Sequence, residues 1–121
     1  MKVIIAGSRT INDPKLIHRA VCNAFGSKGI EITELISGTA NGVDKLGERW
    51  ALKNNIPVKR FPAKWQVDGK LDKQAGFKRN FQMAQYADAL ILVWDGQSHG
   101  SANMLSNMER LGKPIHQEVV R

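Results

Sequence analysis

Short, almost wholly apolar runs that alternate with segments of helical period restrict the fold of this chain more than any other feature. "KVIIAG" (residues 2–7) and "ALILVW" (89–94) are apolar at nearly every position. Strands that are apolar on both faces are typical of a parallel sheet covered on both sides by helices. Three more short runs, "ITELIS", "VKRF" and "PIHQEV", follow the same alternation. The sequence therefore predicts a three-layer α/β sandwich of about five mostly parallel strands, with helices on both faces.

Four segments have the period and the end signals of helices, over residues 12–29, 43–55, 75–88 and 101–112. The first segment has clear signals of a helix N-terminus, because Asn12 or Asp13 can cap it and Pro14 can occupy its first position. In the third, Phe77, Phe81 and Ala84 share one face and are expected to contact the core. The polar stretch "PAKWQVDGKLDKQ" (62–74) is expected to be a surface loop.

Length and composition limit the class of protein. A chain of 121 residues fits one domain, here residues 1–121. The lone cysteine, Cys22, excludes an internal disulfide and is expected to fill the core. No apolar run approaches the roughly 20 residues that cross a bilayer, and the N-terminus becomes polar too soon for a signal peptide. We therefore expect a cytoplasmic protein with no membrane partner.

The loops that follow the first, second and fourth strands are rich in small residues: "GSRTIND", "SGTANGVD" and "DGQSHGS". In open α/β sheets, ligands bind beyond the carboxyl ends of the strands, where the strand order reverses. The formal net charge of +7 favours anionic partners. The three loops are therefore expected to converge on a site for a phosphate-bearing ligand.

"SGTANGVD" has the composition of a loop that cradles a phosphate. Gly38 and Gly42 allow a ligand to approach the backbone, and Ser37 and Thr39 can donate hydroxyl hydrogen bonds. Asp44 can cap the next helix or bind a ribose hydroxyl. The plainer alternative is a tight connection in which the glycines only turn the chain. Neither GxGxxG nor GxxxxGK[ST] occurs here.

The other loops and the third helix add further candidates. Arg9 can bind a phosphate through both guanidinium nitrogens or serve only as a surface ion-pair partner. Arg79 and Asn80 lie at the edge of the third helix, within reach of a ligand. The predicted ligand-binding residues are Gly7, Ser8, Arg9, Ser37, Gly38, Thr39, Gly42, Asp44, Arg79, Asn80, Asp95, Gly96, Ser98, Gly100 and Ser101.

No cluster of His, Cys or Asp has the spacing of metal ligands, so no protein-held metal is expected. Asp44, Asp68 and Asp95 leave open a Mg²⁺ ion that arrives with a phosphate. His99 has the chemistry of a general acid or base, but no nucleophile is apparent beside it.

The ordered set "GSR", "SGTANGVD", "GFKRNFQM" and "ADALILVWDGQSHGS" resembles the SLOG superfamily of Rossmann-like proteins, and most closely its YspA-like branch of small bacterial and phage proteins. The resemblance covers nearly the whole chain. It implies a domain that binds a nucleotide or a nucleotide derivative across these loops. It also implies self-association into a dimer or a larger homo-oligomer.

Two more distant relatives share parts of the pattern. "SGTANGVD" looks like a loop of the DNA-processing protein, which binds single-stranded DNA. The end of the chain looks like the Lonely Guy phosphoribohydrolases, with Arg79 at their Arg and Gly100–Ser101 at their "GT". Their glutamate falls at Asn103 or Met104 here, and neither side chain is a carboxylate. This departure argues against that hydrolase activity, because glycoside cleavage depends on a carboxylate.

Three hypotheses follow from the sequence. The first is binding or sensing of a nucleotide-like molecule, and the second is an enzyme that hydrolyses an N-glycosidic or phosphate bond of such a molecule. The third is binding of single-stranded nucleic acid, for which Trp65 in a Lys-rich stretch is the best stacking residue. A steep dependence of affinity on salt favours the third over the first.

Overall fold

The computed structural model describes residues 1–120. Its main sheet has five strands, all parallel, in the order β3-β2-β1-β6-β7. They are β1 (Lys2–Gly7), β2 (Glu34–Ser37), β3 (Val58–Arg60), β6 (Ala89–Trp94) and β7 (Ile115–Val119). Strand order reverses between β1 and β6, so the predicted position of a ligand site lies at their carboxyl ends.

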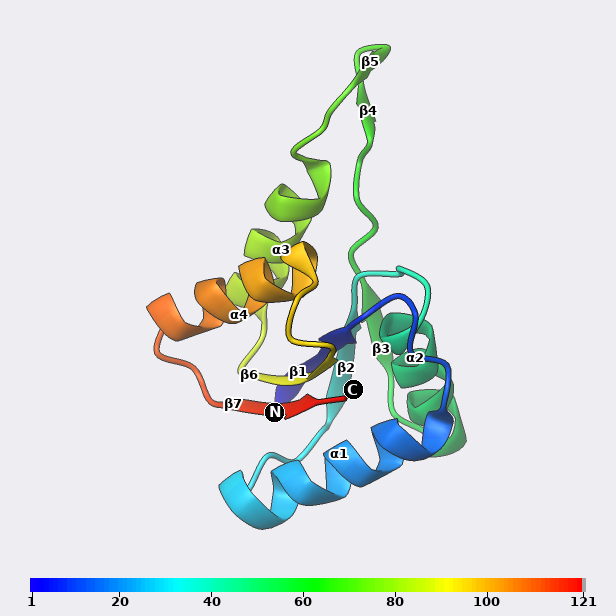
Figure 1. Cartoon of the computed structure of the whole chain (residues 1–121), viewed down its shortest axis with the longest axis vertical. Coiled ribbons are helices and arrows are strands. Elements are labelled where there is room, and N and C mark those ends of the chain that lie inside the picture. The colour runs from blue at the N-terminus through cyan, green and yellow to red at the C-terminus, as the bar shows by residue number, and fades with distance from the viewer. Residues whose placement is uncertain (121) are drawn as a thin grey trace.

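Two helices cover each face of the sheet (Figure 1). One face carries α1 (Pro14–Lys28) and α2 (Val43–Lys53), and the other carries α3 (Ala75–Tyr86) and α4 (His99–Arg110). The predicted three-layer α/β sandwich is confirmed. No helix within residues 1–120 is long and apolar enough to cross a membrane.

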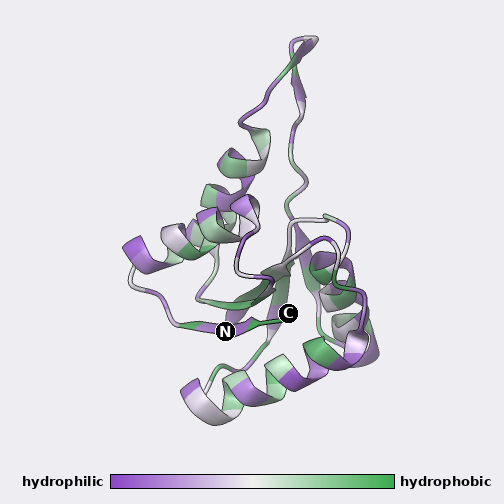
Figure 2. Cartoon of the chain, in the orientation of Figure 1, coloured by the Kyte–Doolittle hydropathy of each residue, from purple (hydrophilic) through white to green (hydrophobic). Residues whose placement is uncertain are grey.

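The two cores are built from alternate residues of the same strands. Val3 and Ile5 of β1 pack beneath α1 and α2, whereas Ile4 packs beneath α3 and α4. β6 is buried at all six positions, and its ribbon in Figure 2 is hydrophobic while the helices alternate in hydropathy. Burial on both faces explains why β1 and β6 lack the alternating pattern of a half-exposed strand.

The first helix begins as predicted and packs differently from the prediction. The Asp13 carboxylate accepts a hydrogen bond from the Lys15 backbone N–H at 3.0 Å. The buried side of α1 consists of Ile17, Ala20 and Ala24, and Cys22 is exposed on the other side. The expectation that Cys22 fills the core was therefore wrong, because it lies about half a turn away from the buried stripe.

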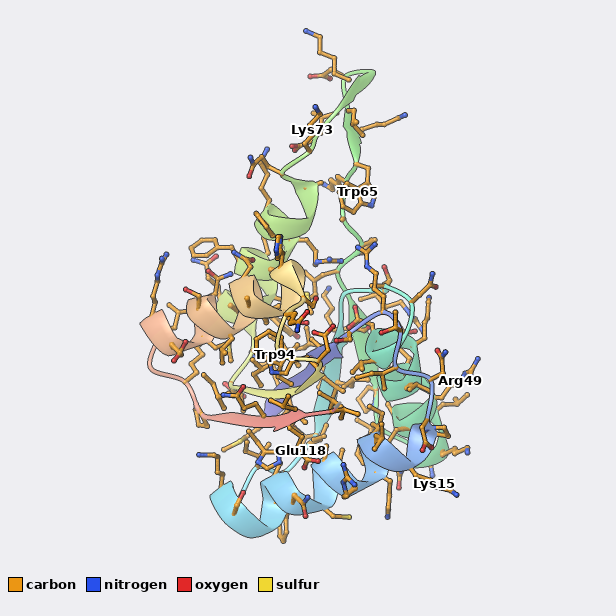
Figure 3. The ribbon with its side chains drawn as sticks, viewed as in Figure 1. Lys15, Arg49, Trp65, Lys73, Trp94 and Glu118 are labelled. Atoms are coloured by element: carbon orange, nitrogen blue, oxygen red, sulfur yellow. The ribbon has the colours of Figure 1, made fainter. Side chains whose placement is uncertain are left out.

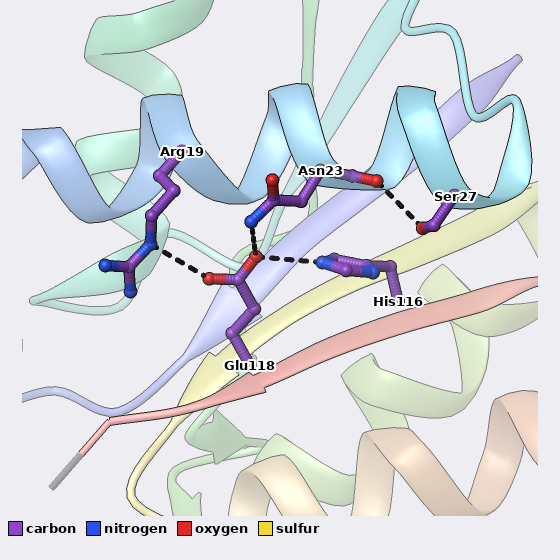
Figure 4. A network of polar contacts seen from close by, with 5 residues as sticks. All are labelled: Arg19, Asn23, Ser27, His116 and Glu118. Carbon is purple, nitrogen blue, oxygen red and sulfur yellow. Dashed lines mark hydrogen bonds and ion pairs between the residues drawn. The ribbon is translucent and has the colours of Figure 1, made fainter.

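Polar contacts attach the edge strand β7 to α1 (Figure 4). The Glu118 carboxylate accepts hydrogen bonds from Arg19 Nε at 3.3 Å and Asn23 Nδ2 at 2.9 Å, and its Oε2 lies 2.9 Å from His116 Nε2. Burial of Glu118 opposes its ionisation, but these hydrogen bonds more than offset that effect and hold the pKa of Glu118 below its usual value. The network accounts for two of the three polar residues of β7, His116 and Glu118. The third, Gln117, accepts a hydrogen bond from Trp94 Nε1 at 3.2 Å.

The third helix shows the sheet a different face from the predicted one. Phe77 and Phe81 are 47% and 49% exposed, and the buried positions are Ala75, Asn80, Met83 and Ala84. Of the three residues predicted to contact the core, Ala84 does so. The prediction that both phenylalanines contact the core was wrong. The helix is rotated so that the polar Asn80 enters the interior.

The stretch from 62 to 74 is a projecting arm and not an irregular loop (Figure 1). It contains a two-stranded antiparallel hairpin, β4 (Gln66–Val67) and β5 (Lys70–Leu71). Asp68 and Gly69 have φ values of +54° and +76°, as a two-residue type I′ turn requires. The Asp-Gly pair is a strong hairpin signal, and the surface-loop prediction overlooked it.

Candidate functional site

Ser8 joins the loops that follow β1 and β6. Its Oγ accepts a hydrogen bond from the Asp95 backbone N–H at 3.0 Å, and its carbonyl oxygen accepts one from the Val43 N–H at 3.3 Å. The residue is buried. Ser8 therefore fixes the carboxyl ends of β1 and β6 and the start of α2 relative to one another.

Two of the predicted glycines allow parts of the chain itself to come close. A Cβ on Gly7 would lie 1.7 Å from the Val93 carbonyl oxygen. A Cβ on Gly42 would lie 2.4 Å from the Ser8 carbonyl oxygen, and the φ of +77° at Gly42 is also unfavourable for other residues. The close neighbour that Gly42 accommodates is thus the backbone of Ser8 and Arg9.

Internal hydrogen bonds hold the "SGTANGVD" loop. Ser37 Oγ donates to Glu48 Oε2 at 2.6 Å and accepts from the Thr39 N–H at 3.1 Å. Asp44 Oδ2 accepts from the Ala40 N–H at 3.1 Å. The loop is therefore already shaped before any ligand arrives, which lowers the entropy that a ligand must remove on binding.

A chain of hydrogen bonds connects this loop to α4 through α3. Arg79 Nη1 donates to the Gly38 carbonyl oxygen, and Arg79 Nε donates to Asn80 Oδ1 at 3.0 Å. Asn80 Nδ2 donates to the Gly100 carbonyl oxygen and to Asn103 Oδ1, both at 3.1 Å. These contacts explain why the polar face of α3 turns inward, since each buried polar group there has a partner.

Two neighbouring cavities open among these loops. The outer cavity, of about 370 Å³, extends toward the arm, and the inner cavity, of about 230 Å³, extends toward α4. Arg9, Ala40 and Arg79 line both cavities. The outer cavity is otherwise lined by Gly38, Thr39, Asn41, Pro62, Ala63 and Trp65. The inner cavity is otherwise lined by Ala6, Gly7, Asp44, Asn80, Ser98, Gly100, Ser101 and Met104.

The inner cavity contains a buried carboxyl group, that of Asp44. The residue is 7% exposed, and burial raises its pKa from 3.8 to about 6. The Ala40 N–H and the positive charges of Arg79 and Arg9 oppose this rise, whereas Glu48 adds to it. Asp44 therefore changes its protonation state close to physiological pH.

Positive charge and free donors face this carboxyl group. Arg9 is exposed and, within residues 1–120, has no ion-pair or side-chain hydrogen-bond partner. The first N–H groups of α4 lack acceptors inside the helix, and Gly100 and Ser101 of that turn line the inner cavity. A Cβ on Gly100 would meet no atom within 4 Å. An anion can therefore approach this helix end beside Arg9 and Arg79, which line the same cavity.

The structure brings most of the predicted residues together. The ones that line the two cavities are Gly7, Arg9, Gly38, Thr39, Asp44, Arg79, Asn80, Ser98, Gly100 and Ser101. Ser8, Ser37 and Gly42 instead serve contacts within the chain. Asp95 and Gly96 line a separate open hollow beside Trp94 and Val119. Asp95 caps its own loop by accepting hydrogen bonds from the Gln97 and Ser98 N–H groups, which lower its pKa.

Sequence reasoning missed the apolar part of the lining. Ala40, Pro62, Ala63 and Met104 carry no functional group that a motif search would select. Met104 lines the inner cavity, and Asn103 accepts a hydrogen bond from Asn80. These are the two residues that the resemblance described above sets opposite the Lonely Guy glutamate. Within residues 1–120 no three His, Cys, Asp or Glu side chains gather as metal ligands, so Asp44, Asp68 and Asp95 do not form a ready cation site.

One comparison with known proteins identifies a relationship. A family model described as the YspA, cpYpsA-related SLOG family matches residues 1–67, which is more than half of the chain. The match covers the strands β1, β2 and β3, the loop that contains Arg9 and the helix α2, which contains Asp44. No curated protein matches the sequence.

Proposed function

Because the chain belongs to the YspA, cpYpsA-related SLOG family, we propose that it binds a nucleotide or a nucleotide-derived small molecule across the inner and outer cavities. The observation that carries this proposal is the meeting of the two cavities at Arg9 and Arg79. Two guanidinium groups beside a helix N-terminus suit a phosphate, and the adjoining apolar lining suits a base.

The chemistry of the lining favours one placement of the ligand. The phosphate lies at the first turn of α4, near Gly100 and Ser101, with Arg9 beside it. A sugar next to it can donate its hydroxyl groups to the ionised Asp44, which would repel a second phosphate. The base then extends into the outer cavity toward Trp65, which is 46% exposed and available for stacking.

A nucleotide-processing activity at the same site is the second candidate. Asp44 favours it, because a buried carboxyl group with a pKa of about 6 can accept or give up a proton near neutral pH. Hydrolysis of an N-glycosidic or phosphate bond would use Asp44 in the role that the missing α4 glutamate leaves vacant.

Single-stranded nucleic acid is a third candidate ligand, supported by the net charge of +7 and the exposed Trp65. Affinity that falls steeply as salt rises would favour this candidate, because a strand releases many counterions on binding.

The decisive experiment is a thermal-shift and calorimetry screen of the full chain. The ligands are nucleoside mono-, di- and triphosphates, NAD, ADP-ribose and a short single strand, at about 50 and about 300 mM salt. A nucleotide at a hundred times its dissociation constant should stabilise the protein by about 2.7 kcal/mol. Chromatography of the incubated samples for free base or phosphate tests turnover in the same series.

Two variants test the placement with little risk to the fold. We expect Arg9→Ala to weaken nucleotide binding roughly 10- to 100-fold, since a hydrogen bond to a charged group contributes about 1.5–3 kcal/mol. Gly100→Ala should weaken it as well, because it adds a methyl group to a residue that lines the inner cavity. Arg49→Ala, which removes an exposed arginine remote from both cavities, is the control. Equal affinity in Arg9→Ala and Arg49→Ala would contradict the proposed site.

A further inference from the structure

A groove between α1 and α2 has no part in the proposed nucleotide site. It has a volume of about 550 Å³ and is lined by Pro14, Lys15, His18, Leu46, Arg49, Trp50, Lys53 and Asn54. We call it the α1–α2 groove. We propose that it docks an acidic segment of a partner protein, which inserts one large apolar side chain between the two helices. None of its lining residues lines the inner or outer cavity.

The floor of the groove is apolar. Leu46 is 5% exposed and belongs to the core beneath α1 and α2, and Trp50 is partly buried against the same core. Because Trp50 is held from below, the groove is shaped in the free protein. An apolar side chain that enters it would be removed from water without first reorganising the site.

The rim of the groove is cationic. Lys15 of α1 and Arg49 and Lys53 of α2 are exposed, and within residues 1–120 none of them has an ion-pair partner. Figure 3 shows Lys15 and Arg49 on neighbouring helices at the same corner of the molecule. Three unpaired positive charges around an apolar floor are complementary to carboxylates that flank an apolar anchor.

The nearby acidic residues within residues 1–120 form no ion pair with this rim. Asp13 caps α1 through the Lys15 N–H, and Glu48 binds Ser37 and Arg60 on the other side of α2. The charge complementarity is therefore left for a partner to satisfy.

The spacing of the lining residues indicates the size of the partner segment. Leu46, Arg49, Trp50 and Lys53 form an i, i+3, i+4, i+7 stripe along α2. Such a stripe is about 10 Å long, so it accommodates about two turns of a helix or a short extended peptide. A nucleic-acid strand fits less well, since stacking requires an exposed ring face and Trp50 is packed into the core.

A peptide selection identifies the chemistry of the occupant directly. A phage-displayed library of random peptides of about 12 residues, the length of roughly three helical turns, is used. The library is selected on the full chain and counter-selected on Arg49→Glu/Lys53→Glu. The most enriched peptide is then synthesised, and its dissociation constant is measured by fluorescence anisotropy. Lys70→Glu/Lys73→Glu, an equal charge change on the arm, is the matched control.

We expect the selected peptides to combine Asp or Glu with one Phe, Leu or Trp. The best of them should bind Arg49→Glu/Lys53→Glu at least 10-fold more weakly than the control, the expected scale for lost charge complementarity. Peptides without acidic residues, equal binding to both variants, or no enrichment would overturn the proposal. A labelled oligonucleotide that bound more tightly than the peptide and lost affinity in the same variant would reassign the groove to nucleic acid.

Discussion

Burial of Asp44 lowers the stability of the protein above pH 6, because the folded state resists its ionisation. The unfolded chain ionises this carboxyl group near pH 3.8, whereas the folded protein does so near pH 6. Between these values the folded state holds a proton that the unfolded state has released. Stability therefore falls as pH rises through this window, and the whole penalty remains above it. A residue kept at such a cost in a cavity is a candidate for ligand contact.

We predict that Asp44→Asn raises the free energy of unfolding at pH 7.5 by roughly 2–3 kcal/mol, since one pKa unit corresponds to about 1.4 kcal/mol. The amide oxygen can still accept the Ala40 N–H. Urea denaturation at a series of pH values is the measurement. Wild type should lose stability relative to the variant between about pH 4 and pH 6.5, the window that the shifted pKa defines. Parallel pH profiles for the two proteins would show that Asp44 titrates normally.

A comparison of Gly42 with Gly26 tests whether close contact with distant backbone explains the need for glycine at position 42. Alanine at Gly42 would have an unfavourable φ and would clash with Ser8 and Arg9, so we expect a loss of roughly 2–4 kcal/mol in unfolding free energy. Gly26 lies inside α1, with no atom within 4 Å of an added Cβ. Gly26→Ala should stabilise the protein by about 0.5–1 kcal/mol through helix propensity. Denaturation midpoints that moved equally in both variants would refute this distinction.

At the scale of elements, α3 shows why helical period alone did not decide orientation. Apolar residues lie on two neighbouring faces of this helix, one with Phe77 and Phe81 and one with Met83. Hydrophobicity alone favours the phenylalanines. The hydrogen bonds of Asn80 to Gly100 and Asn103 favour the other face, and they exist only once α4 is in place.

The arm is a second element, and its hairpin does not pack against the core of the fold. Val67 and Leu71 are 49% and 65% exposed, and neither belongs to a core cluster. At its base the Asp72 N–H donates to the Trp65 carbonyl oxygen at 2.6 Å. The hairpin beyond this hydrogen bond is therefore separable from the stability of the fold.

We predict that replacement of residues 66–71 by Gly-Gly changes the melting temperature by less than about 3 °C, because two residues close the Trp65–Asp72 pair as a β-turn. Circular dichroism would follow the transition. A shortened arm that lowered the melting temperature strongly would mean that the hairpin supports the sheet.

Trp65→Ala in the full arm should leave the melting temperature unchanged and weaken nucleotide binding roughly 5- to 100-fold, the expected contribution of one stacking contact.

At the scale of the whole molecule, the candidate site exists because three loops distant in sequence meet at one end of the sheet. The register that pairs Gly7 with Val93 places the β1 and β6 loops side by side, and Ser8 fastens them. The α1–α2 groove arises in the same way, from two helices that lie on one face of the sheet. Both proposals depend on these tertiary contacts and on no single motif.

The layers of the fold and the loops of the candidate site could be predicted from local sequence. Runs such as "ALILVW" can be satisfied only by burial on both faces, and parallel strands bring their carboxyl-end loops together. Tertiary structure decided which small residues face the cavities. Gly42 and Ser8 are directed to contacts within the chain, whereas Gly100 and Asp44 are left beside open space. Whether a residue contacts the chain or faces a cavity depends on which distant backbone segment packs next to it, and local sequence does not specify that segment.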